Sequence, residues 1–528
     1  MISVRVETDS LGARPFSSAG TALHVPQRLF NAKLALINNT ADAVPELGER
    51  FPELHSESWR VFPDGRMEST YGLKSGLAWH DGTPLTAEDW VFGWRVYAHP
   101  ELGQAGALPQ QAIDVVEAID RQNLRVRWKV PFPGADHLSD RGRELLPLPR
   151  HLLQDVFDRG DMETFLSHPY WSRDYVGVGP YKLEHREPGA YIEAVAFDQY
   201  ALGRPKINRI RIMPIGDSNT VFARIMAGEI HVATDNSIGQ HAELIRRDWE
   251  PRQAGRVLQW PNAWRYTAFQ MRPDLASPAA ILDLRVRKAL AHAIDREAIN
   301  EAVYGGQIIY SSAPVWERSE YGPGVEQATD LVRYAFDLRQ TELLMAQSGF
   351  TRGRDGLYAN ADGRFVGELG TTSGADNEPE VAIMADGFRR AGFEIREHIL
   401  SNVLAQDNML RSTFPTMATS NTNLGIPALL NFATDQIPSA AARWRGSNRG
   451  AWSNAEYDNV MNTFGATLER DQRNAQVARA VTLLSEDLPA IPLFFRSQPF
   501  AHVKELRGPD TSAPEASIPW NVHTWEFQ

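Results

Sequence analysis

The stretch that decides the fold runs from Tyr71 to Tyr97 and reads YGLKSGLAWHDGTPLTAEDWVFGWRVY. Its first part predicts a strand whose apolar side chains alternate, at Tyr71, Leu73, Leu77 and Trp79. A turn is expected at Asp81-Gly82, a pair that tolerates positive φ. A helix follows, with Thr86 as N-cap and Asp89 completing a capping box, and its apolar positions recur at helical spacing: Trp90, Val91, Trp94 and Val96. None of these residues is a catalytic device.

Other segments, far apart in the chain, are equally distinctive. Gly203 to Val232 reads as strand, capped helix and strand, with Gly228 as the helix stop, and Asp283 to Ile299 reads as a helix. The remaining segments are Val176 to Leu183 (VGVGPYKL), Ala451 to Tyr457 (AWSNAEY) and Asp487 to Phe494 (DLPAIPLF). Taken in order, these segments resemble the signatures of the peptide/nickel/opine class of extracellular solute-binding proteins. This is family 5, which includes oligopeptide- and dipeptide-binding proteins and feeds ABC importers.

The resemblance implies an α/β protein with the periplasmic-binding-protein-like fold of type II, cluster C, in which two large lobes are joined by a hinge and a smaller lobe is inserted. We expect a discontinuous first lobe over residues 1–39, 176–265 and 505–528, an inserted lobe over 40–175, and a second large lobe over 266–504. Alternating strands and helices agree with α/β lobes. Within the second large lobe, helices are predicted over Leu331 to Gly349 and Glu378 to Gly392, and a strand over Phe393 to Leu400.

Composition narrows the function classes. The 528 residues, of which 43% are hydrophobic, exceed one ordinary core and fit two or three lobes. The formal charge of −12 disfavours nucleic acid and anionic membrane surfaces as partners, because both repel a negative protein at long range. Cysteine is absent, which excludes disulfides, thiolate catalysis and cysteine-based metal sites.

The N-terminal residues, MISVRVETDS, read as a first strand rather than as the basic and apolar leader of an exported protein. The resemblance implies export. We therefore expect a protein of the periplasm or of the outer face of the cytoplasmic membrane, from which a leader, with any lipid-bearing cysteine, has been removed. The alternative is a cytoplasmic relative that never had a leader.

Ligand-binding residues are expected where strands end, because small molecules bind at the carboxyl ends of strands in open α/β sheets. The resemblance places this crevice between the first and the second large lobe. Asp235 and Asn236 follow a predicted strand, and the aromatic residues Trp260, Trp264 and Tyr266 lie on the segment that leads into the second large lobe. A structural role stays open for each, since Asp-Asn is also a common turn and a lone Trp often lies in a core.

One departure from the family pattern concerns the ligand. Asn423 stands where oligopeptide receptors carry the Asp that anchors the α-ammonium of the peptide, and the nearby Asn421 is uncharged as well. A buried ammonium needs a charged partner, because an amide offsets only part of its desolvation. We expect an oligopeptide-like or other small polar solute. The alternative is an oligosaccharide, a polyol or another neutral solute, and Asp235 is the first candidate for an ammonium anchor elsewhere.

No enzyme is predicted. The chain lacks a Gly-x-Ser-x-Gly elbow, a phosphate-binding Gly-rich loop and a His-Glu-x-x-His pair, so no catalytic, metal or cofactor residues are assigned. The expected partners are a small-molecule or short-peptide ligand and ABC permease subunits, without nucleic acid, and the protein is expected to be a monomer. Two other classes stay open: a non-transport sensor or chaperone, and a hydrolase on the same scaffold.

Overall fold

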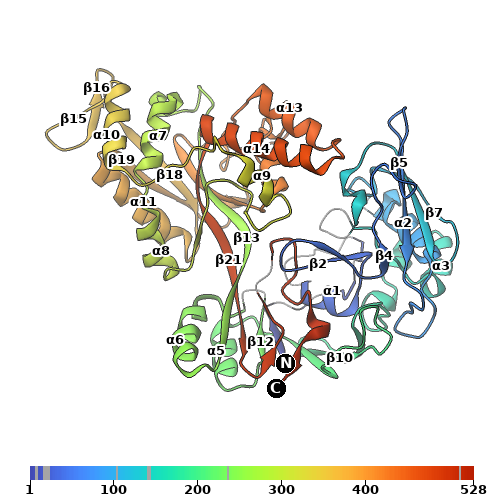
Figure 1. The fold of residues 1–528 in the computed structure, drawn as a ribbon. Coiled ribbons are helices and arrows are strands. Elements are labelled where there is room, and N and C mark those ends of the chain that lie inside the picture. The colour runs from blue at the N-terminus through green and yellow to red at the C-terminus, as the bar shows by residue number, and fades with distance from the viewer. Residues whose placement is uncertain are drawn as a thin grey trace. The chain divides into compact units, whose positions relative to one another are not determined.

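The computed structural model describes residues 1–5, 7, 10–12, 14–15, 24–102, 105–138, 144–234, 237–510 and 513–528. The chain forms two compact units. The first comprises Met1–Pro261, Gly465–Leu468 and Gln498–Gln528, and the second comprises Asn262–Phe464 and Glu469–Ser497. Both units contain helices and strands (Figure 1), and each has hydrophobic cores of its own.

The first unit contains a mixed sheet in the order β12-β1-β11-β10-β9, in which β1 pairs in parallel with β11 and β12. The strands are β1 (Ile2–Val4), β9 (Tyr181–Glu187), β10 (Tyr191–Ala196), β11 (Arg209–Pro214) and β12 (Val232–Ala233). A large core packs against this sheet with side chains from the helices α1 (His24–Phe30), α3 (Arg150–Asp158), α4 (Met162–Leu166), α5 (Ser218–Met226) and α6 (Ala242–Arg252). The predicted helix stop at Gly228 is confirmed, since α5 ends at Met226 and Gly228 has a φ of +73°.

A second sheet of the first unit has the order β4-β6-β8-β7, with β5 paired to β6. Its strands are β4 (Gly48–Arg50), β5 (Trp59–Val61), β6 (Met67–Leu73), β7 (Ile113–Ala118) and β8 (Asn123–Trp128). It has a separate hydrophobic core, to which the helix α2 (Ala87–Tyr97) contributes the fully buried Trp90. Two short pairs complete the unit: β2 (Ala35–Ile37) with β3 (Ala43–Pro45), and β22 (Leu506–Arg507) with β23 (Glu526–Phe527).

The segment Tyr71–Tyr97 folds largely as predicted. Helix α2 begins after Thr86, and the capping box is present, because the main-chain N–H of Thr86 donates to the carboxylate of Asp89 at 2.9 Å. The predicted strand is shorter than expected. It ends at Leu73 because the chain turns directly afterwards, and Gly76 takes a φ of +73° there.

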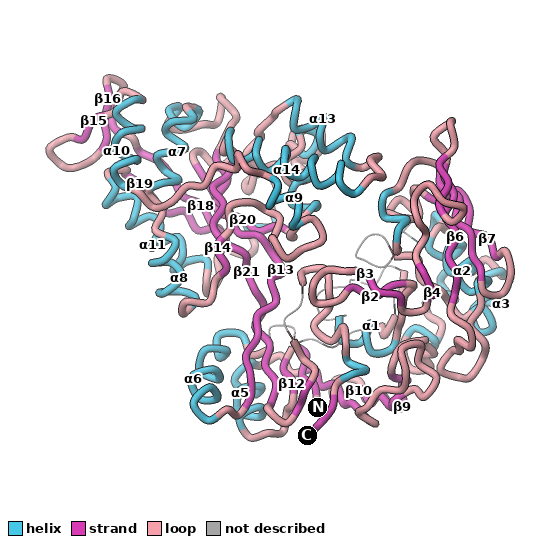
Figure 2. The backbone as a smooth tube through the Cα atoms, viewed as in Figure 1, coloured by secondary structure: helices cyan, strands magenta, loops and turns pink. Residues whose placement is uncertain are grey.

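The second unit is built on a sheet in the order β19-β18-β20-β13-β21, with β14 paired to β21. Strands β18 and β19, and likewise β18 and β20, are parallel, whereas β20 and β13 are antiparallel. The strands are β13 (Gly255–Phe269), β14 (Ile309–Tyr310), β18 (Val366–Thr372), β19 (Glu394–Leu400), β20 (Met417–Thr422) and β21 (Ala490–Val503). The long strands β13 and β21 lie side by side and each contributes residues to both units (Figure 2).

The helices of the second unit contribute to two cores, one of which contains α7, α8, α10 and α11 and the other α9, α13 and α14. They are α7 (Leu284–His292), α8 (Arg296–Tyr304), α9 (Gly322–Gln327), α10 (Leu338–Gln347), α11 (Asn377–Ala391), α12 (Ile426–Leu430), α13 (Ala455–Phe464) and α14 (Arg470–Asp487). A small sheet joins β15 (Thr351–Arg352), β16 (Tyr358–Asn360) and β17 (Gly363–Arg364).

Two helix predictions in this unit need correction, and capping explains both. The segment Asp283–Ile299 is not one helix but parts of α7 and α8, because the side chain of Asp295 accepts the N–H of Ala298 and starts a new helix. The helix expected from Leu331 begins only at Leu338, where Asp337 provides the cap. The predictions of α11 and of the strand β19 are confirmed.

The predicted lobes and the two compact units agree only in part. The second unit starts at Asn262 rather than at 266, and its last segment ends at Ser497 rather than at 504. Apart from residues 262–265, the predicted first and inserted lobes together fall in the first unit, which has two large separate cores. Their division into two lobes stays a prediction.

Candidate ligand site

The structure describes five of the seven predicted site residues. Asp235 and Asn236 lie outside the described residues. Trp260 is buried in the first unit, in a small cluster with Leu258, Phe500 and Ile518. Its indole Nε1 donates to the main-chain oxygen of Ala513 at 3.1 Å, as expected for a core tryptophan.

Trp264 and Tyr266 lie in the second unit, on the same face of β13. Their rings stack, with centroids 4.6 Å apart and planes inclined by 20°. Trp264 is buried and donates from Nε1 to the hydroxyl of Ser311 at 2.9 Å, whereas the ring of Tyr266 lines a cavity. The tryptophan therefore supports the tyrosine, and only the tyrosine reaches the cavity.

The cavity has a volume of about 380 Å³ and lies within the second unit. It is formed at the carboxyl halves of the parallel strands β18, β19 and β20, together with β13 and two loops, at 410–415 and 447–450. Its volume falls in the range of about 300–1,000 Å³ that is usual for small-molecule sites. Asn421, at the end of β20, lines this cavity, whereas the exposed Asn423 is not among the lining residues.

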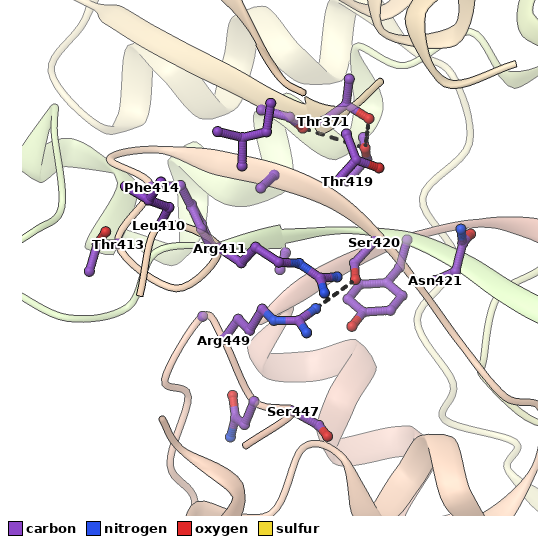
Figure 3. Close-up of a pocket in the computed structure, with 18 of the residues that line it drawn as sticks. Thr371, Leu410, Arg411, Thr413, Phe414, Thr419, Ser420, Asn421, Ser447 and Arg449 are labelled. Atoms are coloured by element: carbon purple, nitrogen blue, oxygen red, sulfur yellow. Dashed lines mark hydrogen bonds between the residues drawn. The ribbon is translucent and has the colours of Figure 1, made fainter. Parts of the chain in front are cut away.

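Two arginines enter the cavity from the two loops. Figure 3 shows the side chains of Arg411 and Arg449 extending in the same direction towards Ser420. Arg449 Nη1 donates to Ser420 Oγ at 3.5 Å, the long limit of a hydrogen bond. Among the residues that the structure describes, no carboxylate oxygen lies within 4.0 Å of either guanidinium.

Burial and like charge act on these two groups. Burial lowers the pKa of Arg449, and the neighbouring positive charge of Arg411 lowers it further. Burial also lowers the pKa of Arg411. Beside them, burial raises the pKa of the Tyr266 phenol, while its hydrogen bond with Ser420 and the nearby arginines act against that rise. At neutral pH the cavity therefore presents two cationic groups beside a neutral phenol.

The other charged side chains of the cavity are Arg265 and Glu368, and Arg265 has a counter-charge. Arg265 on β13 is 2% exposed and forms an ion pair at 2.8 Å with Glu380 of α11, which is 0% exposed. Arg265 also donates from Nη2 to the hydroxyl of Thr419 at 3.0 Å, and Tyr304 donates to Glu380 at 3.0 Å. Glu368 lies 3.5 Å from the ring of His398. The positive charge without a carboxylate partner among the described residues therefore belongs to Arg411 and Arg449.

Buried polar side chains fix the backbone of both loops. Gln270, which is fully buried, donates from Nε2 to the main-chain oxygens of Ser412 and Phe414 at 3.2 and 2.7 Å. Asn448 donates to the oxygens of three residues around the second loop, namely Phe432, Ala433 and Trp452. A side chain on Gly450 has no room, because a Cβ there would lie 2.3 Å from the main-chain oxygen of Phe269. The positions of the two arginines are thus set by the fold.

The arginine pair was missed in the sequence because both residues lie on loops and match no local motif. The only signal is that Arg411 lies ten residues before Asn421, which was a predicted site residue, and that signal is weak. In the described part of the chain, no group of three or more His, Asp or Glu side chains is placed to hold a metal ion. The cavity instead offers guanidinium, hydroxyl and amide groups, whose hydrogen-bonding capacity suits a polar organic solute.

The fold and this cavity define a periplasmic-binding-protein-like molecule of type II, and comparison with known proteins identifies the family. The family model for bacterial extracellular solute-binding proteins, family 5 Middle, matches residues 51–432. The chain belongs to family 5 of the bacterial extracellular solute-binding proteins. Among the described residues, no helix is both long and apolar enough to cross a membrane.

Individual relatives are distant in sequence. The oligopeptide-binding protein AppA of Bacillus subtilis is 23% identical over 457 residues, which cover 84% of this chain and 78% of AppA. The structure of HbpA2 from Haemophilus parasuis gives a TM-score of 0.76 at 16% identity, covering 100% of this chain and 99% of that one. The structure of NikZ from Campylobacter jejuni, solved in complex with Ni(L-His), gives a TM-score of 0.69 at 20% identity. The match covers 99% of this chain and 98% of NikZ. These structures share the fold with this chain.

Proposed function

We propose that the protein captures a small polar solute or a short peptide in the cavity of its second unit and delivers it, unmodified, to the permease of an ABC importer. The observation that carries this proposal is the cavity at the carboxyl halves of β18, β19 and β20, which is lined by groups suited to binding a polar solute. The family of the chain supports the transport role, and AppA is named for binding oligopeptides.

We place the protein outside the cytoplasmic membrane, as its family is extracellular. In this account the chain itself contributes binding and the importer's ATPases contribute the energy of transport. The closing of the two large lobes over the solute, which the family resemblance implies, stays a prediction, as does a monomeric state.

Native mass spectrometry of the protein, purified without a denaturation step, tests the proposal. We expect a fraction of molecules to carry one additional small mass, and mild activation should release that solute chemically unchanged. The protein stripped of solute by urea and refolded should bind the same solute again in calorimetry. Release of a hydrolysed product would instead favour the hydrolase class.

A further inference from the structure

The cavity carries positive charge that lacks a carboxylate partner among the described residues. The neutral side chains of Asn421 and Asn423 gave no indication of this charge. The positive charge of Arg265 is neutralised by Glu380 within the core, and the carboxylate of Glu368 lies beside His398. Arg411 and Arg449 have no such partner among the described residues. Two positive charges therefore share one polar cavity in which, among the described residues, no carboxylate contacts either guanidinium, although Glu368 also lines the cavity.

This arrangement is unfavourable for the empty protein. Each guanidinium loses part of its hydration, and the two like charges repel, which is reflected in the lowered pKa of Arg449. The fold nevertheless maintains it. Arg272 donates to the main-chain oxygens of Ser412 and Arg449, so the loops that carry the two arginines are tied to one point. A costly arrangement that rigid neighbours hold in place is typical of a binding site.

The side chains around Arg411 and Arg449 indicate which kind of solute would complement them. Guanidinium groups bind the two oxygens of a carboxylate, or those of a phosphate, with parallel hydrogen bonds. Ser420 and Asn421 add neutral polar groups at the same place, and the apolar part of the wall is formed by Tyr266, Leu400, Leu410, Phe414, Phe432 and Trp452. A solute with an anionic end and an apolar body matches this combination.

We propose that the solute carries an anionic group, in the first place a carboxylate, which binds between Arg411 and Arg449 while its body lies against Tyr266 and Phe414. This inference rests on the proposed receptor function and names the chemistry of its solute. A carboxylate can come from the C-terminus of a peptide or from a small organic acid, and a phosphate ester offers similar chemistry. The experiment separates these sources.

The probes are matched pairs that differ in the anionic group. Two pairs compare an acid with its amide: the tripeptide Ala-Phe-Ala with its C-terminal amide, and phenylacetate with phenylacetamide. The third compares inorganic phosphate with chloride at the same concentration. Stripped protein is titrated with each by calorimetry and thermal unfolding. We expect at least one anion to bind and to raise Tm while its neutral partner binds about tenfold to a hundredfold more weakly. The pair that responds identifies the source of the anion.

The variants are Arg411→Gln and Arg449→Gln, with Arg445→Gln as the matched control, because Arg445 is exposed and does not line the cavity. Each cavity variant should weaken the responding anion by about tenfold to a hundredfold. In the absence of any anion, each should also raise Tm, because repulsion and desolvation are relieved. The control should change neither quantity.

Three outcomes overturn the inference. The first is equal binding of the acid and its neutral partner, and the second is an affinity that both cavity variants leave unchanged. The third is a lower Tm of both empty variants together with no response to any anion of the panel, phosphate included, because the arginines would then have a structural role. In the first two cases the receptor function survives, because a probe still binds. In the third case it survives if native mass spectrometry detects a bound neutral solute, and it fails with the inference if no solute is found.

Discussion

The guanidinium of Arg272 donates to the main-chain oxygen of Arg449 at 2.8 Å, so one arginine positions the backbone of another. The same Nη1 atom donates to the oxygen of Ser412 at 3.0 Å, and Nη2 donates to that of Pro438 at 2.9 Å. Both loops of the cavity therefore depend on a residue that does not itself line the cavity.

Arg272→Lys should destabilise the second unit by on the order of 2 kcal/mol, because an ammonium cannot serve three carbonyl oxygens as a planar guanidinium does. Solute affinity should fall as well, since Arg411 and Arg449 lose their fixed positions. Urea unfolding and calorimetry measure the two effects. Arg445→Lys is the control, because Arg445 is exposed and does not line the cavity. An Arg272→Lys protein with unchanged affinity would show that the loops are positioned without this contact.

The buried pair of Arg265 and Glu380 should be sensitive to loss of one partner. Glu380→Ala leaves a guanidinium that is 2% exposed without its counter-charge, at a cost of about 3–5 kcal/mol. Asp386→Ala on the same helix, α11, removes an exposed ion pair with Arg390 and should cost less than about 1 kcal/mol. Urea denaturation of both variants provides the comparison. Similar losses in the two proteins would argue against a specific role for the buried pair.

Two glycines of the second unit should respond in opposite directions to Ala. Gly450→Ala places a Cβ 2.3 Å from the oxygen of Phe269, so the loop that carries Arg449 must move, at a cost of about 1–3 kcal/mol. Gly387→Ala, inside α11, meets nothing closer than 3.8 Å and should stabilise the helix by about 0.5–1 kcal/mol. Thermal unfolding tests both. A neutral Gly450→Ala variant with normal solute affinity would contradict the assigned rigidity of this loop.

Stability should fall in mild acid because of His80 in the first unit. The N–H of Gly177 donates to its Nδ1 at 3.1 Å, and its Nε2–H donates to the oxygen of Gly179 at 3.0 Å, so only the neutral ring fits. Burial lowers the pKa of His80 to about 4 from 6.5. The unfolded chain thus binds the proton first, and the free energy of unfolding should decrease between about pH 6.5 and pH 4, by on the order of 3 kcal/mol.

The variant His80→Gln tests whether His80 causes this loss of stability as the pH falls. The variant should show a shallower loss of stability than the wild type between about pH 6.5 and pH 4 in urea titrations at several pH values. Part of the slope should remain, because burial also lowers the pKa of His523 to about 4. If both proteins lose stability equally over this range, His80 is not the group responsible.

Local features of the sequence predicted the local structure well. The cap of α2 and the glycine end of α11 are encoded within a few residues of each helix, so both were predicted correctly. The comparison with the family pattern led to Asn421, which does lie at the cavity, although its role in binding stays a prediction. No local pattern indicated the burial of Trp260, because that burial depends on Phe500 and Ile518, which are distant in the chain.

The charge of the cavity could not be predicted in the same way. Arg411 and Arg449 are brought together by Gln270 and Arg272, whose hydrogen bonds reach main-chain oxygens far along the sequence. Hydrogen bonds to main-chain oxygens leave no recognisable pattern in the sequence, because every residue has a carbonyl oxygen. The sequence analysis consequently considered the neutral residue Asn423 and did not detect the cationic pair.

A crystal structure of the protein with its copurified or titrated solute tests the central claim most directly. We expect electron density for one unmodified small molecule in the cavity of the second unit, with an anionic group within hydrogen-bond distance of Arg411 and Arg449 and its body against Tyr266. A solute bound elsewhere, with this cavity filled only by water, would contradict the assignment of the site.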